Sequence, residues 1–162
     1  MTIRKATFDD TADIRQVYNK AKEYMNASGN PNQWEIGYPP EEVLKDDIES
    51  GNLYVICEDT VKAVFAFIRG IDSTYITIDG KWLRDAPYCA MHRIASDGTI
   101  KGVFHIITEY CKKEAGNGTD LKVDTHHDNK TMQHVIKKEG FVECGIIHLE
   151  NGDPRIAYQL IN

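Results

Sequence analysis

The stretch from Asp124 to Phe141 constrains the fold most, because consecutive residues there specify a strand end, a turn, a helix and a helix stop. Residues 121–125 alternate apolar and polar side chains, which is the period of a strand with one buried face. The side chain of Asp128 or Asn129 can then accept a hydrogen bond from the next turn and cap a helix. Three apolar residues recur at helical spacing: Met132, Val135 and Ile136. Gly140 supplies the left-handed residue that ends such a helix.

The remaining segments predict a mixture of strands and helices. Apolar residues recur at helical spacing in residues 9–28, in residues 41–50 and from Val103 onward. Strand-like runs occur at residues 3–6, 53–58, 61–68, 88–95, 141–149 and 155–160. In the irregular segment 70–87, we expect a short strand at residues 75–78, a turn at Asp79-Gly80 and an anchor at Trp82. The order strand, loop, helix, strand, helix from Tyr88 to Lys138 predicts a right-handed crossover.

Length, charge and cysteine spacing restrict the class of protein. A chain of 162 residues is long enough for one domain that buries roughly 70% of the surface of its unfolded chain. A net charge of −6 disfavours a nucleic-acid binder, which needs a basic face. The four cysteines form no CxxC pair, which argues against a zinc site and a disulfide framework. With no leader segment and no apolar run of membrane-spanning length, we expect a soluble cytoplasmic protein.

Two polar side chains, His92 and Arg93, stand side by side in the strand predicted at residues 88–95. Neighbours on a strand point to opposite faces, so at least one of them is directed toward a packed region and needs a partner. We interpret His92 either as a hydrogen-bonded structural residue or as a general base. We expect Arg93 to pair with a carboxylate, and Asp124 is the candidate.

The loop at residues 30–40 is rich in turn residues but carries two large rings, Trp34 and Tyr38. One interpretation is that both rings cap the core. The helix predicted at residues 41–50 carries an acidic run, which we interpret as a solvated face rather than as a means of attracting a cationic amine.

The helix that follows residue 129 also carries a recognisable spacing. Four residues match the pattern Asn-x-x-Ala-x-x-x-Tyr-x-Lys-x-Gly-Phe: Asn129, Lys138, Gly140 and Phe141. This pattern resembles a signature of the GNAT superfamily of acyl-CoA-dependent N-acyltransferases. Met132 stands at its alanine position and Ile136 at its tyrosine position. The phrases HRIAS, KGV, DTHHDNKTMQ, GF and CGIIHLENGDPRIAYQ extend the resemblance, toward a bacterial subgroup of the family, over nearly the whole chain.

The resemblance implies a mixed α/β (α+β) fold in a single domain over residues 1–162. In that fold, a central, mostly antiparallel sheet of six to seven strands is flanked by about four helices. The sheet opens between the strands at residues 88–95 and 121–125, and an acyl-CoA lies in that opening.

The resemblance also implies acetyl-CoA as the cosubstrate, bound without a metal. Strand, glycine-containing loop and helix start form an anion cradle, because the free N–H groups of a first helical turn point into the loop. The expected contacts with the pantetheine arm come from Ile94, Ala95, Ser96, Asn129 and Met132. Those with the phosphates come from the amides of Lys101, Gly102, Val103 and Phe104. Here Thr99 replaces the Arg or Gln of the family loop, and Phe104 replaces its last small residue.

The chemistry is expected to need a base, since Ile136 cannot donate a proton as the family's tyrosine does. By chemistry the candidates are His92, His126, His127, Tyr88 and Glu35, of which His126 and His92 are preferred. For the acceptor, the resemblance implies contacts with Trp34, Glu35, Tyr38 and Tyr88. No metal is expected at His126-His127-Asp128, because adjacent histidines at a strand end diverge.

Two functions are therefore weighed. The first is an N-acetyltransferase that acts by direct attack of a primary amine, of a small molecule or peptide, on acetyl-CoA. The second is a non-catalytic CoA-binding sensor or interaction module. Neither nucleic acid nor membrane is an expected partner, and a homodimer is an assembly that the resemblance allows.

Overall fold

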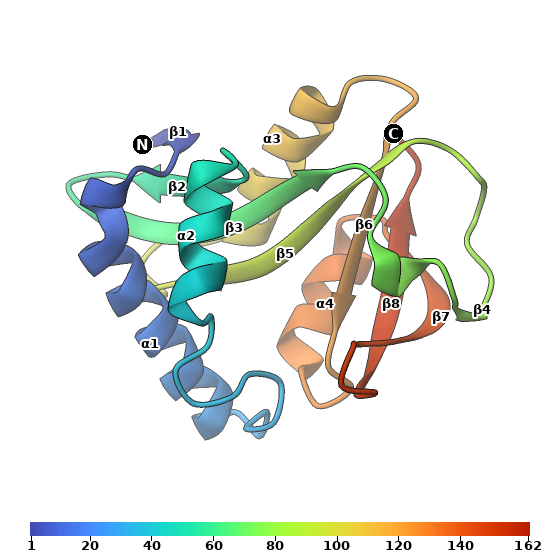
Figure 1. Ribbon diagram of the computed structural model, residues 1–162, viewed down its shortest axis with the longest axis horizontal. Helices are drawn as coiled ribbons and strands as arrows, with labels where there is room; N and C mark the ends of the chain where they lie inside the picture. Colours follow the sequence, from blue (N-terminus) through green and yellow to red (C-terminus); the bar gives the residue numbers. More distant parts are fainter. The chain divides into compact units, whose positions relative to one another are not determined.

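The structure is a computed structural model that describes residues 1–162, and Figure 1 traces the chain from blue at the N-terminus to red at the C-terminus. The chain divides into two compact units. The first comprises Met1–Phe67 and His92–Val103, and the second Ile68–Met91 and Phe104–Asn162. The single domain expected over residues 1–162 stays a prediction. None of the helices combines the length and the apolar character needed to cross a membrane.

The first unit combines two helices with one antiparallel part of the sheet. Its elements are β1 (Thr2–Lys5), a 3-10 turn (Phe8–Asp10), α1 (Thr11–Ala27), α2 (Glu41–Glu49), β2 (Leu53–Cys57), and most of β3 (Val61–Arg69) with the second half of β5 (Tyr88–Ser96). β2 pairs with β1 on one side and with β3 on the other, antiparallel in both cases. The helical spacing of α1 places four residues on its buried face: Ile14, Val17, Tyr18 and Ala21.

The second unit holds the remaining elements. They are the rest of β3 and β5, a 3-10 turn (Ser73–Tyr75), β4 (Asp79–Gly80), α3 (Val103–Ala115, from its second residue), β6 (Asp120–Thr125), α4 (Lys130–Lys138), β7 (Val142–His148) and β8 (Pro154–Leu160). β6 runs parallel to β5 and antiparallel to β8, which forms a hairpin with β7. Asn129 caps α4 and Gly140 follows its end in a left-handed conformation, as the sequence predicted.

The strand order is β1-β2-β3-β5-β6-β8-β7-β4, which confirms the predicted mixed α/β class with a mostly antiparallel sheet and four α-helices. The sheet has eight strands instead of the six to seven predicted. The parallel ladder between β5 and β6 starts at Tyr88 and Asp120 and stops at Met91 and Val123. Both strands continue beyond that rung, β5 to Ser96 and β6 to Thr125. The ladder therefore ends within the strands for which an opening was predicted.

The segment 70–87 differs from its prediction. The strand predicted at residues 75–78 is absent: Tyr75 ends a 3-10 turn that begins at Ser73, and residues 76–78 are irregular. Asp79-Gly80 is the short strand β4 instead of a turn. β4 pairs with β7 through Gly80 and Gly145. A Cβ atom added to either glycine would lie 2.2 Å from a carbonyl oxygen of the other strand, so this pairing needs glycine on both sides. The pairing of β4 with β7 joins two glycines distant in sequence, and such a contact leaves no periodic signal.

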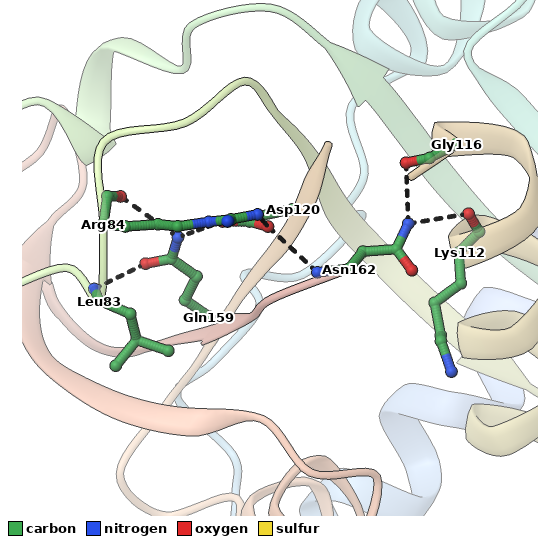
Figure 2. Close-up of polar contacts among 7 residues, drawn as sticks. All are labelled: Leu83, Arg84, Lys112, Gly116, Asp120, Gln159 and Asn162. Atoms are coloured by element: carbon green, nitrogen blue, oxygen red, sulfur yellow. Dashed lines mark hydrogen bonds and ion pairs between the residues drawn. The ribbon is translucent and has the colours of Figure 1, made fainter. Parts of the chain in front are cut away.

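A buried carboxylate, Asp120 at the start of β6, gathers several segments of the second unit (Figure 2). It accepts hydrogen bonds of 2.8 and 2.6 Å from Arg84, one of 2.9 Å from Gln159 and one of 3.1 Å from the backbone N–H of Asn162. The Arg84 guanidinium is the main reason that the pKa of Asp120 is lowered. Gln159 also accepts a hydrogen bond from the backbone N–H of Leu83. The network thus fastens the segment around residue 84 and the C-terminal residue to β6.

Candidate active site

In the first unit, Arg93 interrupts the regular course of β5. Its φ of 51° lies in the left-handed region, and Arg93 is the one residue other than glycine with a positive φ. Its guanidinium donates two hydrogen bonds of 2.8 Å to the carboxylate of Asp47 in α2. Its carbonyl oxygen accepts a hydrogen bond of 3.0 Å from the hydroxyl of the fully buried Tyr18 in α1. Two helices therefore hold this one residue, as a strained backbone requires.

The predicted pairing of Arg93 with Asp124 is wrong. Asp124 accepts a hydrogen bond of 2.6 Å from the hydroxyl of Tyr75. The prediction assumed regular strand alternation, which the left-handed conformation of Arg93 breaks. The acidic face of α2 is likewise not wholly solvated, because Asp47 is buried. Its spacing from the buried Leu44 and Ile48 is the signal that distinguishes it from the exposed acidic residues of α2.

The rings of the loop at residues 30–40 come together as expected of large side chains near the core. Trp34 stacks on Tyr38, with ring centroids 5.1 Å apart, and meets Tyr18 edge-on at 5.8 Å. Trp34 and Glu35 also line a cavity of about 80 Å³ with Asn30. The structure thus connects the loop to Tyr18 and, through the Tyr18 hydroxyl, to the carbonyl of Arg93. The contacts of Trp34, Glu35 and Tyr38 with an acceptor stay predictions.

The loop between β5 and α3 is held by short-range hydrogen bonds. The Ser96 hydroxyl accepts from the N–H of Gly98, and the Asp97 carboxylate accepts from the N–H and hydroxyl of Thr99. Gly102 has a φ of 69°, and no atom lies within 4 Å of the place where a Cβ would stand. This leaves the backbone before α3 open to close approach. The predicted cradle residues therefore precede or begin a helix as expected: Lys101, Gly102 and Val103.

In the second unit, the ring of Phe104 is buried and packs against Phe141, with ring centroids 6.1 Å apart. The large side chain at the position of the family's small residue is thus accommodated in the core. Ile136, at the position of the family's tyrosine, is fully buried. It contributes packing and no proton donor.

His126, Asn129 and Met132 lie together at the turn that joins β6 to α4. The side-chain oxygen of Asn129 accepts from the N–H of Met132 at 3.0 Å, and the N–H of Asn129 donates to the carbonyl of His126. The side-chain oxygen of Asn129 therefore forms the helix cap, and the expected contact of this side chain with a pantetheine arm stays a prediction. The role of Met132 at this site stays a prediction.

The ring of His126 is buried and stacks on His127, with centroids 4.2 Å apart. The expectation that adjacent histidines diverge is wrong, because both residues lie at the end of β6, where the chain turns. Burial, followed by Arg155 and His127, lowers the pKa of His126. Its Nδ1 accepts from the N–H of Asp128 at 3.1 Å, so Nε2 carries the proton of the neutral ring. To act as a base, His126 has to release Asp128.

The ligand atoms of His126, His127 and Asp128 lie within 4.8 Å of one another, a separation at which they could surround a metal ion. The lone pair of His126 Nδ1 already points at an N–H group.

His92, the other preferred base, is half-buried on β5 in the first unit, next to Arg93. Ile94, Ala95 and Ser96 follow it on the same strand.

Tyr88 belongs to an aromatic group that sequence reasoning recognised only in part. Its hydroxyl accepts from the N–H of Asp72 at 2.8 Å, and its ring lies 3.9 Å from the Lys122 ammonium. Trp82 covers the same ammonium at 3.8 Å and donates from Nε1 to the carbonyl of Tyr75 at 2.9 Å, which fits its expected role as an anchor. Burial lowers the pKa of Lys122. Lys122 was missed because it occupies a polar position of an alternating strand.

Tyr88 also borders a cavity of about 650 Å³ in the second unit, together with Arg69, Asp85 and Cys89. Arg69 also donates a hydrogen bond to the carbonyl of Glu114 at the end of α3. The cavity gives Tyr88 a setting in which contact with a small molecule is sterically feasible. Its predicted contact with an acceptor stays a prediction.

The chain is similar to several solved structures of acetyltransferases. No family model matches the sequence, and no curated protein does. A solved structure of a GNAT-family acetyltransferase from Streptococcus agalactiae 2603 is 34% identical, covers 99% of this chain and 95% of its own, and has a TM-score of 0.85. A putative acetyltransferase from Staphylococcus aureus Mu50 is 21% identical over 99% of both chains, with a TM-score of 0.70. RimL, a ribosomal L7/L12 α-N-protein acetyltransferase solved with coenzyme A, shares the fold at 15% identity, 98% and 92% coverage and a TM-score of 0.61.

Proposed function

The chain belongs to the GNAT family of acetyltransferases, and we propose that it transfers an acetyl group from acetyl-CoA to a primary amine of a small molecule or peptide. The observation that carries the proposal is the 34% identity over 99% of the chain to an acetyltransferase of this family. The coenzyme A in RimL, a protein of the same fold, supports acetyl-CoA as the donor. In direct transfer, the amine attacks the thioester carbon while the protein orients both groups.

The backbone before α3 fits an anionic group of the donor. Gly102 is open on the side where a Cβ would stand, and the ring of Phe104 is buried against Phe141. We therefore assign the phosphates to the amides of residues 101–104, where the N-terminal dipole of a 13-residue helix favours negative charge. The main chain of Ile94, Ala95 and Ser96 is assigned to the pantetheine arm.

For the acceptor, Trp34, Glu35, Tyr38 and Tyr88 are the proposed contacts, and His126 or His92 is the proposed base. The lowered pKa of His126 keeps its ring neutral near pH 7, which a base requires. A net charge of −6 favours a cationic amine over a nucleic acid as partner. A cytoplasmic protein acting alone or as a homodimer is part of the proposal.

Calorimetric titration of the purified protein with acetyl-CoA tests the proposal, with ATP as the control for generic phosphate binding. We expect micromolar affinity for acetyl-CoA and none for ATP at the same concentrations. An amine panel, with release of the CoA thiol as the signal, then identifies the acceptor. No heat of binding up to millimolar acetyl-CoA contradicts the proposal.

One observation favours the non-catalytic alternative: the buried Ile136 removes the proton donor that the family places there. The two functions differ in the effect of replacing the base. In an enzyme, His126→Asn or His92→Asn abolishes transfer and leaves acetyl-CoA binding nearly unchanged. In a sensor, neither variant changes anything measurable except stability, because no transfer takes place.

A further inference from the structure

The hydroxyl of Tyr158 in β8 is fully buried and has no hydrogen-bond partner. Buried tyrosine hydroxyls normally find a partner, and an exception points to strain, to a catalytic role or to a missing bound group. Burial raises the pKa of Tyr158 to about 12. The phenol is thus a protonated donor with nothing to donate to.

The register of the β6–β8 pairing defines where Tyr158 lies in the second unit. Tyr158 is directly opposite Val123 in the β6–β8 pairing, and Val123 forms the last rung of the β5–β6 ladder with Met91. Directly paired residues face the same side of a sheet, so Tyr158 shares the face of Val123. Two residues on, Leu160 on that same face approaches Gly140 at the end of α4. The unpaired hydroxyl therefore lies on the α4 side, on the row where the parallel ladder stops.

The opposite face shows that missing partners are not a general property of this unit. There the Tyr75 hydroxyl meets Asp124, the Trp82 indole meets a carbonyl, and the Gln159 amide meets Asp120. Two further buried atoms lack partners, Asn30 Oδ1 and Thr108 Oγ1. Asn30 still donates to Gln33, however, and Thr108 lies within α3. Of the three, Tyr158 is the residue that pairs with the last rung of the parallel ladder.

We propose that Tyr158 is a catalytic residue whose hydroxyl donates a hydrogen bond to the acetyl thioester during transfer. The inference rests on the proposed function. In the step, the amine nitrogen forms a bond to the carbonyl carbon, the carbon–sulfur bond breaks, and its electron pair leaves on the CoA sulfur. The amine proton goes to the base. The phenol holds its own proton, because its pKa of about 12 exceeds that of a thiol, about 8.5. It stabilises negative charge on oxygen or sulfur without being consumed.

Tyr158→Phe tests the proposal, because it removes one oxygen atom and keeps the packing of the ring. With acetyl-CoA and the best amine of the panel, we expect thiol release to slow about 100-fold, the usual effect of losing one such donor. Acetyl-CoA affinity in calorimetry should change less than about fivefold, since the bond strengthens in the transition state. The melting temperature of the free protein should rise by about 2–4 °C, because an unsatisfied buried hydroxyl is removed.

Tyr54→Phe is the matched control, since Tyr54 is a buried strand tyrosine whose ring stacks on Phe65. It should leave the rate unchanged. A spectroscopic arm covers the case in which acetyl-CoA binds but no amine of the panel reacts. In protein labelled with ¹³C at tyrosine Cζ, acetyl-CoA should shift the Tyr158 resonance, assigned by its absence from Tyr158→Phe.

Wild-type rates in Tyr158→Phe, or acetyl-CoA binding that leaves the Tyr158 resonance in place, overturn the inference while the proposed function stands. A wild-type protein that binds no acetyl-CoA overturns both. A lower melting temperature of free Tyr158→Phe shows that the hydroxyl has a structural partner, which also overturns the inference.

Discussion

The guanidinium of Arg93 in β5 donates two hydrogen bonds of 2.8 Å to the carboxylate of Asp47 in α2. Both side chains are largely buried, at 15% and 10% exposure. The pair keeps a residue with a φ of 51° in the middle of β5, where every other residue is extended. Its main effect is therefore on the shape of the strand, since a buried ion pair adds little net stability by itself.

Removing one partner of this ion pair should destabilise the folded protein. Asp47→Ala leaves the buried Arg93 guanidinium without its carboxylate, and we expect the free energy of unfolding to fall by about 3–5 kcal/mol. Urea denaturation measures the change. Asp46→Ala, at the exposed neighbouring position of the same helix, should stay within about 0.5 kcal/mol of the wild type. Equal effects of the two substitutions would show that the pair does not hold the strand.

The ionisation of Asp120 should make the free energy of unfolding depend on pH in the acidic range. Asp120→Ala removes the acceptor of four hydrogen bonds and should cost about 3 kcal/mol at pH 7. Arg84 holds the folded-state pKa below the unfolded value of about 3.9, so the stabilisation is complete above pH 4. It is lost as the pH falls through the lower folded value. Urea titrations from pH 7 to pH 2 should therefore show the difference between wild type and variant shrinking below pH 4. A constant difference contradicts the assignment.

Local signals predicted much of this fold, because they lie within a few residues of one another. The cap at Asn129, the apolar stripe of α4 and the stop at Gly140 occur within a dozen positions, and all three are found in the structure. The hairpins of β2 with β3 and of β7 with β8 follow from the same short-range patterns.

The candidate site was less predictable, because its contacts join residues far apart in the chain. Arg93 and Asp47 are 46 positions apart, and Tyr75 and Asp124 are 49 apart. No periodicity specifies which carboxylate an arginine meets, and no propensity predicts a left-handed arginine within a strand. The missing partner of Tyr158 is visible only when its whole surroundings are known.

His126 should link stability to pH in the neutral range. Burial lowers its folded-state pKa below the unfolded value of about 6.5, so the neutral ring is the stable form in the folded protein. The free energy of unfolding should therefore decrease as the pH falls from 7.5 to 5, and His126→Gln should flatten this decrease. His134→Gln, at an exposed position of α4, is the control for the loss of a histidine side chain. Parallel profiles for wild type and His126→Gln would show that His126 titrates normally.

Two opposing effects determine how much the Lys122 ammonium contributes to the free energy of unfolding. Two aromatic rings attract its ammonium, at about 0.5–2 kcal/mol for each contact, while burial lowers its pKa and so opposes the charge. Lys122→Met keeps the length of the side chain and removes both terms, so we expect a change in unfolding free energy within about 1 kcal/mol. Trp82→Ala instead leaves the charge and deletes a packed ring, and should cost about 3 kcal/mol. If Lys122→Met is as damaging as Trp82→Ala, the ammonium contributes far more than its contacts with the two rings explain.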